Sequence, residues 1–521
     1  MSDKIKLSHY TKTIITFMII SLLLILSFNC YNYYQITKNP PSDMWSKETT
    51  IGIANSDNIP KIIKEDDRIL VAYQGTNDFV ISVCDISGNK ISDSHYSYNS
   101  SYINNLMFFK KGSSYFLTYN YDNVESGNLE AIELNSQMDE INRSQYTDVK
   151  QCFQINSRYI IFYHSGIMSC YDLIEDTETS TSVENASYIA AAQCGNSVFI
   201  TYFNFSSVEG LIMKDGVFSD IMDLAPHIYS TGITYSDLTI SGDSDNCYIL
   251  YTKYRHQEPI GSKCIVYDFN TNSFKENPFS HEEVSNIRGC YSSTNARFYG
   301  SMERELINRH FQSDLVSFTL NNNQMEDITL ATRQRSNDLN EYGDDEYLVY
   351  LDYNNGSYRV NITSTNNKFI NANSGFKKID IINAISYTLE TIFTGFAYTL
   401  VIGSCWVIPS VCAASIGSML IYKLKDKYRN LLFVTIPIIT LCLKYYMITA
   451  ITYYGCSNGY CTIITKPSSI LLISALYLVI TNMVHYINFN NRKDHFLVTK
   501  ISIPIILDCI ISCILFMPIM P

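Results

Sequence analysis

The sequence predicts two kinds of structure in one chain: an all-β domain in the middle and α-helices that span a membrane at both ends. The 521 residues are too many for one ordinary domain. Long apolar runs occur only near the two ends. The middle has short apolar runs bounded by Gly, Asn, Asp and Ser, which is typical of strands and turns. We therefore expect a folded β-domain over residues 45–375, outside the membrane, and about five membrane helices.

The first apolar run, Ile14–Phe28, follows three lysines near the N-terminus. With its polar neighbours it predicts a first membrane anchor over residues 14–30, about as long as a thin bilayer requires, after a cytoplasmic segment of residues 1–13. A cleaved secretory signal and a lipid-modified Cys30 are the alternatives. The run is not followed by a small-residue cleavage site, which favours the uncleaved anchor.

Four further apolar runs predict a membrane bundle over residues 391–521. Linkers of residues 31–44 and 376–390 would join the β-domain to its two membrane parts. The predicted spans of the bundle are residues 391–422, 431–454, 468–487 and 497–519.

Basic residues concentrate at the N-terminus, between the first two spans of the bundle and between its last two. Lysine and arginine mark the cytoplasmic side of membrane proteins. We therefore expect a multi-pass protein of the plasma membrane, with the lipid bilayer as one partner. Its N-terminus would be cytoplasmic, and both residues of about 35–385 and the C-terminus would lie outside the cell.

Two ionisable residues fall inside predicted spans: Lys444 and Asp508. Charges inside a membrane are costly and usually face a partner or a water-filled cavity. At 1.5 Å per residue the two side chains would lie at similar depths, about 20 and 17 Å from the cytoplasmic side. The hypothesis is an intramembrane ion pair that fixes the register of the helices.

One pair of cysteines is a candidate disulfide. Cys456 and Cys461 flank a short turn between two predicted spans, on the expected outer side. In an oxidising compartment this is the pair expected to form a bond.

The middle of the chain is repetitive. A polar turn followed by a short β-rich run, usually ending in tyrosine, recurs seven times. The runs end at residues 73, 119, 163, 202, 251, 301 and 350, with serine at the sixth place. A second strand-like run follows most of them, so each unit contains at least one hairpin. The tyrosines are interpreted as packing residues, since aromatic side chains suit a half-buried pleated surface.

Periods of about forty to fifty residues with several strands per unit resemble the seven-bladed β-propeller class. The resemblance concerns the fold alone, because the sequence has no WD dipeptide and no kelch double glycine. It implies seven sheets around an axis, each covering its neighbours. A pair of β-sandwiches is the alternative fold.

Several classes of function are disfavoured. The net charge is −12 and the middle has no basic run, which argues against nucleic-acid binding. H-E-x-x-H, G-x-S-x-G and Walker patterns do not occur, nor does a C-x-x-C spacing in the β-domain. No catalytic, cofactor-binding or metal-binding residue is therefore predicted, and no cofactor.

The function expected is binding, scaffolding or sensing. By analogy with the fold, a protein or small-molecule ligand would sit at the axial mouth of the propeller. Two alternatives stay open. One is a transport or permease-associated subunit in which Lys444 and Asp508 act. The other is a propeller-based hydrolase or lyase outside the cytoplasm.

Overall fold

The computed structural model divides the chain into two compact units. The β-unit comprises Pro40–Arg304 and Gln312–Gly375, and the helical unit comprises Met1–Asn39, Glu305–Phe311 and Phe376–Pro521. The structure describes residues 2–98, 103–121, 127–147, 149, 151–155, 158–205, 207–226, 232–280, 284–290, 295–307, 310–321, 323–333, 339–344, 346–354, 356–421, 427–455, 468, 471–476, 478–480 and 497–516.

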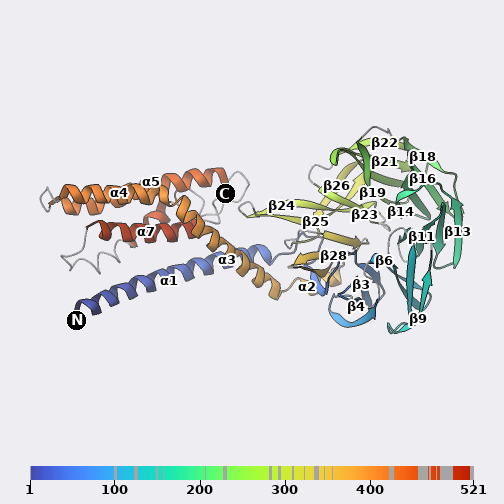
Figure 1. The fold of residues 1–521 in the computed structure, drawn as a ribbon, viewed down its shortest axis with the longest axis horizontal. Coiled ribbons are helices and arrows are strands. Elements are labelled where there is room, and N and C mark those ends of the chain that lie inside the picture. Colours follow the sequence, from blue (N-terminus) through green and yellow to red (C-terminus); the bar gives the residue numbers. More distant parts are fainter. Residues whose placement is uncertain are drawn as a thin grey trace. The chain divides into compact units, whose positions relative to one another are not determined.

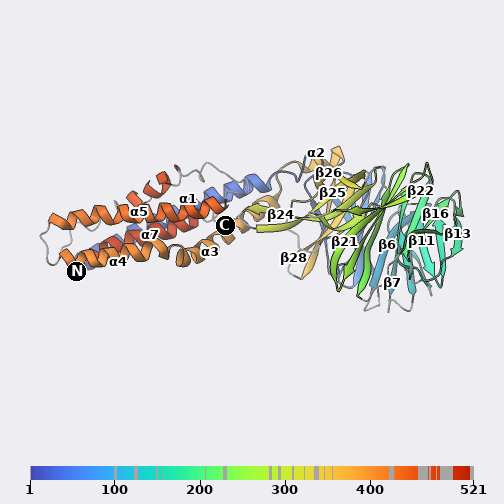
Figure 2. The ribbon, with the colours of Figure 1, turned by 90° about the horizontal axis from the view of Figure 1, so that it is seen from above.

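The described part of the β-unit forms seven antiparallel sheets arranged around a common centre (Figures 1 and 2). Six sheets have four strands, and the fourth along the chain has a fifth strand, β18, beside β16. We number the sheets as blades from the N-terminal side. Blade 1 contains β2 (Lys61–Lys64), β3 (Arg68–Gln74), β4 (Asp78–Asp85) and β5 (Lys90–Ser97); blade 2, β6 (Ile103–Lys111), β7 (Ser114–Tyr121), β8 (Asn128–Leu134) and β9 (Glu140–Tyr146); blade 3, β10 (Gln151–Gln154), β11 (Tyr159–His164), β12 (Ile167–Asp172) and β13 (Thr177–Ser182); blade 4, β14 (Ser187–Cys194), β15 (Ser197–Phe203), β16 (Ser207–Lys214), β17 (Val217–Phe218) and β18 (Met222–Pro226); blade 5, β19 (Ile233–Gly242), β20 (Asn246–Arg255), β21 (Glu258–Asp268) and β22 (Ser273–Phe279); blade 6, β23 (Val284–Gly289), β24 (Arg297–Ile307), β25 (His310–Asn321) and β26 (Gln324–Leu330); blade 7, β27 (Leu339–Gly343), β28 (Tyr347–Asn354), β29 (Ser357–Ser364) and β1 (Thr49–Ala54).

The last blade is completed by the first strand. β1 pairs with β29 in antiparallel register, from Thr49 opposite Ile362 to Ala54 opposite Tyr358. Two segments about 310 residues apart in sequence are thereby hydrogen-bonded into one sheet. The ring is closed without a free edge between its first and last blades.

Apolar packing between the blades runs all the way round the ring. Seven clusters of buried side chains in the β-unit each draw residues from two neighbouring blades, including the pair of blades 7 and 1. The second strand of a blade is covered on both faces; every residue of β15 is buried. The outermost strands are mostly exposed, as in β13. The β-unit is a seven-bladed β-propeller.

This architecture confirms the propeller that the repeat predicts and excludes the pair of sandwiches. The physical basis is that a single four-stranded blade buries neither of its faces alone. The second strand of a blade has apolar side chains on both faces, so each blade requires a neighbour on either side.

The helical unit contains long helices that run in roughly one common direction in both ribbon views (Figures 1 and 2). Its core includes Trp406, Cys509 and Cys513, all buried. The described helices of the chain are α1 (Ser2–Thr37), α2 (Asn367–Asn373, in the β-unit), α3 (Lys378–Val401), α4 (Ser404–Ile421), α5 (Lys427–Gly455) and α7 (Leu497–Phe516).

The membrane part of the sequence-based prediction is wrong on this evidence. Among the residues that the structure describes, no helix combines the length and the apolar character that crossing a membrane requires. The run of residues 391–422, expected to be one span, is divided between α3 and α4, with an interruption at Gly403. Half of the span expected over residues 468–487 lies outside the described residues. The sidedness inferred from the basic residues stays a prediction.

Closure through β1 can be tested with two isoleucines on that strand. Ile51 is buried at the contact of blades 7 and 1, whereas Ile53 is 63% exposed. We expect Ile51→Ala to lower the free energy of unfolding of the propeller by about 2–4 kcal/mol, because it removes buried methyl groups and leaves a cavity. Ile53→Ala should cost less than about 0.5 kcal/mol. Urea unfolding followed by circular dichroism measures both, and equal effects would show that the strand does not seal the ring.

Candidate ligand-binding site

The two charged residues singled out in the sequence meet in the helical unit. Lys444 Nζ on α5 lies 2.9 Å from both carboxylate oxygens of Asp508 on α7, and both side chains are fully buried. Nearby, Thr440 Oγ1 donates to Ser410 Oγ at 2.8 Å. Breaking a buried pair of this kind would be costly, since either charge alone would be left without its counter-charge. Cys456 and Cys461 lie outside the described residues.

The propeller's own polar features begin with a repeated tyrosine. In blades 1, 2, 4 and 5 a buried tyrosine near the end of the second strand packs against the preceding blade. We call this place the slot position of a blade. The four slot tyrosines are Tyr73, Tyr119, Tyr202 and Tyr251.

Each slot tyrosine fills the gap between two blades, and three of the four also hydrogen-bond within their own blade. Tyr119 Oη donates to Glu130 Oε1 at 2.5 Å. Tyr73 Oη lies 3.3 Å from Ser82 Oγ. Tyr251 Oη donates to Glu276. In these three blades the ring fills the gap and the hydroxyl meets a polar group of an outer strand. The hydroxyl of Tyr202 has no hydrogen-bond partner among the described groups.

Blade 3 departs from this pattern. The side chains of its second strand that face the preceding blade are shifted by one residue relative to the repeat of tyrosines. Tyr163, which the repeat aligns with the slot tyrosines, packs toward blade 4. Ile160 and Phe162 pack toward blade 2. Side chains alternate along a strand, so the slot residue of blade 3 is His164. Its Nδ1 lies 3.5 Å from Ser165 Oγ in the following turn.

A cavity of about 630 Å³ lies between blades 2 and 3, where the slot tyrosine is missing. It reaches the surface, since Tyr146 and Ile167, two of its lining residues, are 53% and 43% exposed. A volume of this size falls within the usual range for ligand pockets. On the side of blade 2, Leu129 stands where blade 1 has Phe79, which packs on Tyr119 with ring centroids 4.6 Å apart. Both walls of this gap therefore carry smaller side chains than the gap between blades 1 and 2.

Most of the lining is apolar or aromatic. Phe109 and Phe116 stack with ring centroids 5.5 Å apart, and Phe162 and Tyr171 face them from blade 3. At one end Lys111 donates to Tyr171 Oη at 2.6 Å and pairs with Asp176 at the same distance. The hydrogen bond to Asp176 raises the pKa of Lys111. Lys111 therefore stays protonated, and the carboxylate of Asp176 balances its charge.

The lining also contains a hydroxyl without a partner. Thr118 is 3% exposed, and its Oγ1 has no hydrogen-bond partner among the described groups. The equivalent residue of blade 4, Thr201, donates to Glu209 O at 3.0 Å. A buried hydroxyl left without a hydrogen bond costs about 1–3 kcal/mol. Thr118 is therefore available to a group that enters the cavity.

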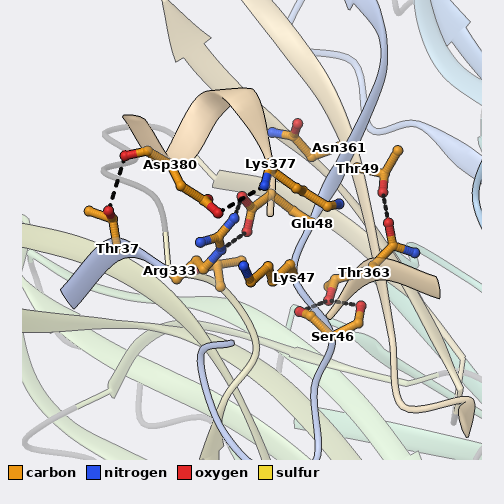
Figure 3. A network of polar contacts seen from close by, with 12 residues as sticks. Thr37, Ser46, Lys47, Glu48, Thr49, Arg333, Asn361, Thr363, Lys377 and Asp380 are labelled. Carbon is orange, nitrogen blue, oxygen red and sulfur yellow. Dashed lines mark hydrogen bonds and ion pairs between the residues drawn. The ribbon is translucent and has the colours of Figure 1, made fainter. Parts of the chain in front are cut away.

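Blade 6 also lacks the tyrosine, and Met302 stands in its slot and packs toward blade 5. Blade 7 is the third departure, and there the gap is charged. Leu348 and Tyr350 pack toward blade 6, which makes Asp352 the slot residue of blade 7. Next to it, Arg333 binds Glu48 through two hydrogen bonds of 3.0 Å (Figure 3). Burial, and then the charges of Glu48 and Asp352, raise the pKa of Tyr350.

A third buried carboxylate, Asp314 on β25, lies close enough to Tyr350 to help raise its pKa. Asp314 accepts hydrogen bonds from Arg304 at 2.9 Å, Gln312 at 2.5 Å and Thr332 at 3.2 Å. Burial raises the pKa of Asp314 to about 6 despite these partners. On the side of blade 7, the hydroxyls of Ser46 and Thr363 lie 3.1 Å apart (Figure 3). Asp314 and the Ser46–Thr363 pair thus each have hydrogen-bond partners within the chain, which indicates a structural role.

The axial mouth, where a ligand was expected, contains basic groups. Lys61 on β2 and Arg288 on β23 belong to the innermost strands of blades 1 and 6. Burial, and after it the positive charge of Arg288, lowers the pKa of Lys61 to about 7. Blade 7 separates these two blades, so the side chains influence each other across the centre of the ring. A ligand at this mouth stays a prediction.

Sequence reasoning missed the cavity and its residues Thr118, His164 and Ser169. One feature of the sequence could have indicated that His164 occupies the slot. The step from 163 to 202 is the shortest between repeats, and Tyr163 is followed directly by His164 and a Ser-Gly turn. Alignment by the turns instead of by the tyrosines would have placed His164 in the slot.

Comparison with known proteins gives no family and only distant likenesses to solved structures. No protein-family profile and no curated protein matches the sequence. Among solved structures, the β-propeller domain of the Trilobed protease from Pyrococcus furiosus is similar over 59% of this chain and 94% of its own, at 10% identity and a TM-score of 0.36. The Dos1 propeller is similar over 64% of this chain and 96% of its own, at 10% identity and a TM-score of 0.38. A structure from a study of two prolyl endopeptidases is similar over 65% of this chain and 49% of its own, at 8% identity and a TM-score of 0.37. These likenesses concern the fold alone.

The helical pair is testable by a double-mutant cycle. Asp508→Asn should lower the free energy of unfolding by about 3–5 kcal/mol, because it leaves the Lys444 ammonium buried without its counter-charge. The double variant with Lys444→Met should recover much of that loss. Thermal unfolding of the full chain gives both values. Simple addition of the two single effects would contradict a coupled pair.

The raised pKa of Asp314 predicts a pH dependence. Its pKa is higher in the folded chain than in the unfolded chain, so its favourable contribution is complete below about pH 4 and is lost as the pH rises through about 6. Relative to Asp314→Asn, the native protein should lose on the order of 2–3 kcal/mol over this interval. The removal of the Arg304 contact adds an offset that does not change with pH.

Fluorescence can follow this change locally. Trp45 packs beside Tyr299 in the same gap between blades 6 and 7, and the chain has two tryptophans. In a Trp406→Phe background, Trp45 reports unfolding of this region alone. A stability difference between native and Asp314→Asn proteins that stays constant from pH 4 to 6 would refute the predicted titration.

Proposed function

We propose that this protein is a ligand-binding module that holds a small, largely apolar group in the cavity between blades 2 and 3. The observation that carries the proposal is a cavity of about 630 Å³ whose lining contains a buried hydroxyl, on Thr118, without a partner. Ligand pockets combine an apolar lining with a few placed polar groups in this way.

The alternative of a mere packing defect is less favourable. The six other gaps between blades are filled by the chain's own apolar side chains or, between blades 6 and 7, partly by paired charges. A void between well-packed blades loses dispersion contacts and costs stability. A ligand that occupies the void recovers those contacts, which favours a binding role for this one gap.

A fluorescent probe tests the proposal directly. N-phenyl-1-naphthylamine is apolar and emits strongly only away from water, so we expect one equivalent to bind the full-length protein. Ala131→Phe, which fills the cavity from β8, should lower the affinity at least tenfold. Ile141→Phe adds the same ring at an exposed site on β9 and serves as the control. An unchanged affinity in Ala131→Phe would refute binding in this cavity.

A further inference from the structure

The filled slots of the other blades indicate which chemical group would fit this cavity. In four other blades the corresponding slot is filled by the chain's tyrosine ring, whose position relative to the outer strands is set by register. Blade 3 repeats the surrounding strands but offers His164, a smaller residue that is only half-buried, in place of tyrosine. The missing group in this sector is a p-hydroxyphenyl ring.

The polar partner for such a ring is also present. In blade 1, Ser82 on β4 pairs with Val71, two residues before the slot residue Tyr73, and its hydroxyl meets the tyrosine hydroxyl. In blade 3, Ser169 on β12 pairs with Phe162, two residues before the slot residue His164. Ser169 is 7% exposed and lines the cavity. The two serines are therefore equivalent.

The next strand outward continues the equivalence. Ser82 pairs with Asp93 on β5 and donates to it at 2.7 Å. In blade 5 the residue at the same place, Glu276, receives the hydrogen bond of Tyr251. Blade 3 has Ser180 at this place, opposite Ser169, and Ser180 also lines the cavity. Two neutral hydroxyls thus stand at the two places where blades 1 and 5 receive the phenol hydroxyl of their slot tyrosine.

We infer that the cavity between blades 2 and 3 takes a p-hydroxyphenyl group, with its ring between Phe116 and Phe162 and its hydroxyl at Ser169 and Ser180. This inference rests on the proposed binding function of the cavity. It adds the chemical class of the ligand, which is the phenol of a free small molecule or of a tyrosine side chain in a peptide.

The affinity of p-cresol compared with that of toluene tests the ligand class. The two molecules differ by one hydroxyl, so a hydrogen bond within the cavity should favour p-cresol by about three- to tenfold. Calorimetry on the full-length protein, and competition against N-phenyl-1-naphthylamine, measure both affinities. The tripeptides acetyl-Gly-Tyr-Gly-amide and acetyl-Gly-Phe-Gly-amide form the second pair. Preference for p-cresol without binding of the tyrosine peptide assigns the site to free phenols, and binding of both assigns it to tyrosine side chains as well.

Three variants locate the effect. Ser169→Ala should remove the preference for p-cresol over toluene and leave toluene binding unchanged. Ser82→Ala changes the equivalent serine of blade 1, where Tyr73 already fills the slot, and should leave p-cresol binding as in the native protein. His164→Tyr supplies the missing ring from the chain itself, so it should abolish p-cresol binding and raise the midpoint of thermal unfolding.

The outcomes separate the two proposals. Toluene binding equal to or tighter than that of p-cresol, with no effect of Ser169→Ala, overturns the phenol class and leaves an apolar ligand site. Absence of binding by the naphthylamine probe, toluene and p-cresol alike overturns the binding function itself. Full p-cresol affinity in a folded His164→Tyr protein places the ligand elsewhere and overturns the inference.

Discussion

Contact between the faces of neighbouring blades is the interaction on which the rest of this structure depends. Each blade is a small sheet with two apolar faces, and neither face is covered unless a neighbour stands on each side. The requirement propagates around the ring and ends only when the first and last blades meet. The pairing of β1 with β29 makes that last contact permanent, because strand hydrogen bonds join the two ends of the propeller.

The slot position shows how one requirement is met by different chemistry. A tyrosine there supplies both apolar volume and a hydroxyl that can be satisfied within the blade. Where blade 3 has His164, volume is lacking and a cavity remains. Where blade 7 has Asp352, apolar filling gives way to a buried network that includes Glu48 and Arg333. Of the three blades without a slot tyrosine, blades 3 and 7 thus have the two gaps with distinctive physical properties, one open and apolar, the other closed and charged.

Much of the fold was accessible from the sequence, because strand propensity and turn residues are local signals and the repeat multiplies them seven times. The meeting of Lys444 and Asp508 followed from their similar distance along two helices, and the structure brings them within 2.9 Å of each other. The membrane spans were inferred from the hydropathy of linear runs, and the described helices do not bear them out. The cavity was missed, because alignment of the repeats by their tyrosines put Tyr163 in the slot, whereas its side chain packs toward blade 4.

The sequence by itself determined the number of blades and the existence of a tyrosine-rich packing layer, since both follow from short-range patterns of residue type. Only the tertiary structure decided which face each residue of a second strand presents. A shift of one residue exchanges the two faces of a strand, and nothing in the local pattern of an all-apolar strand registers that shift. For this reason the cavity beside His164 and the charged gap beside Asp352 are established by the packing of neighbouring blades.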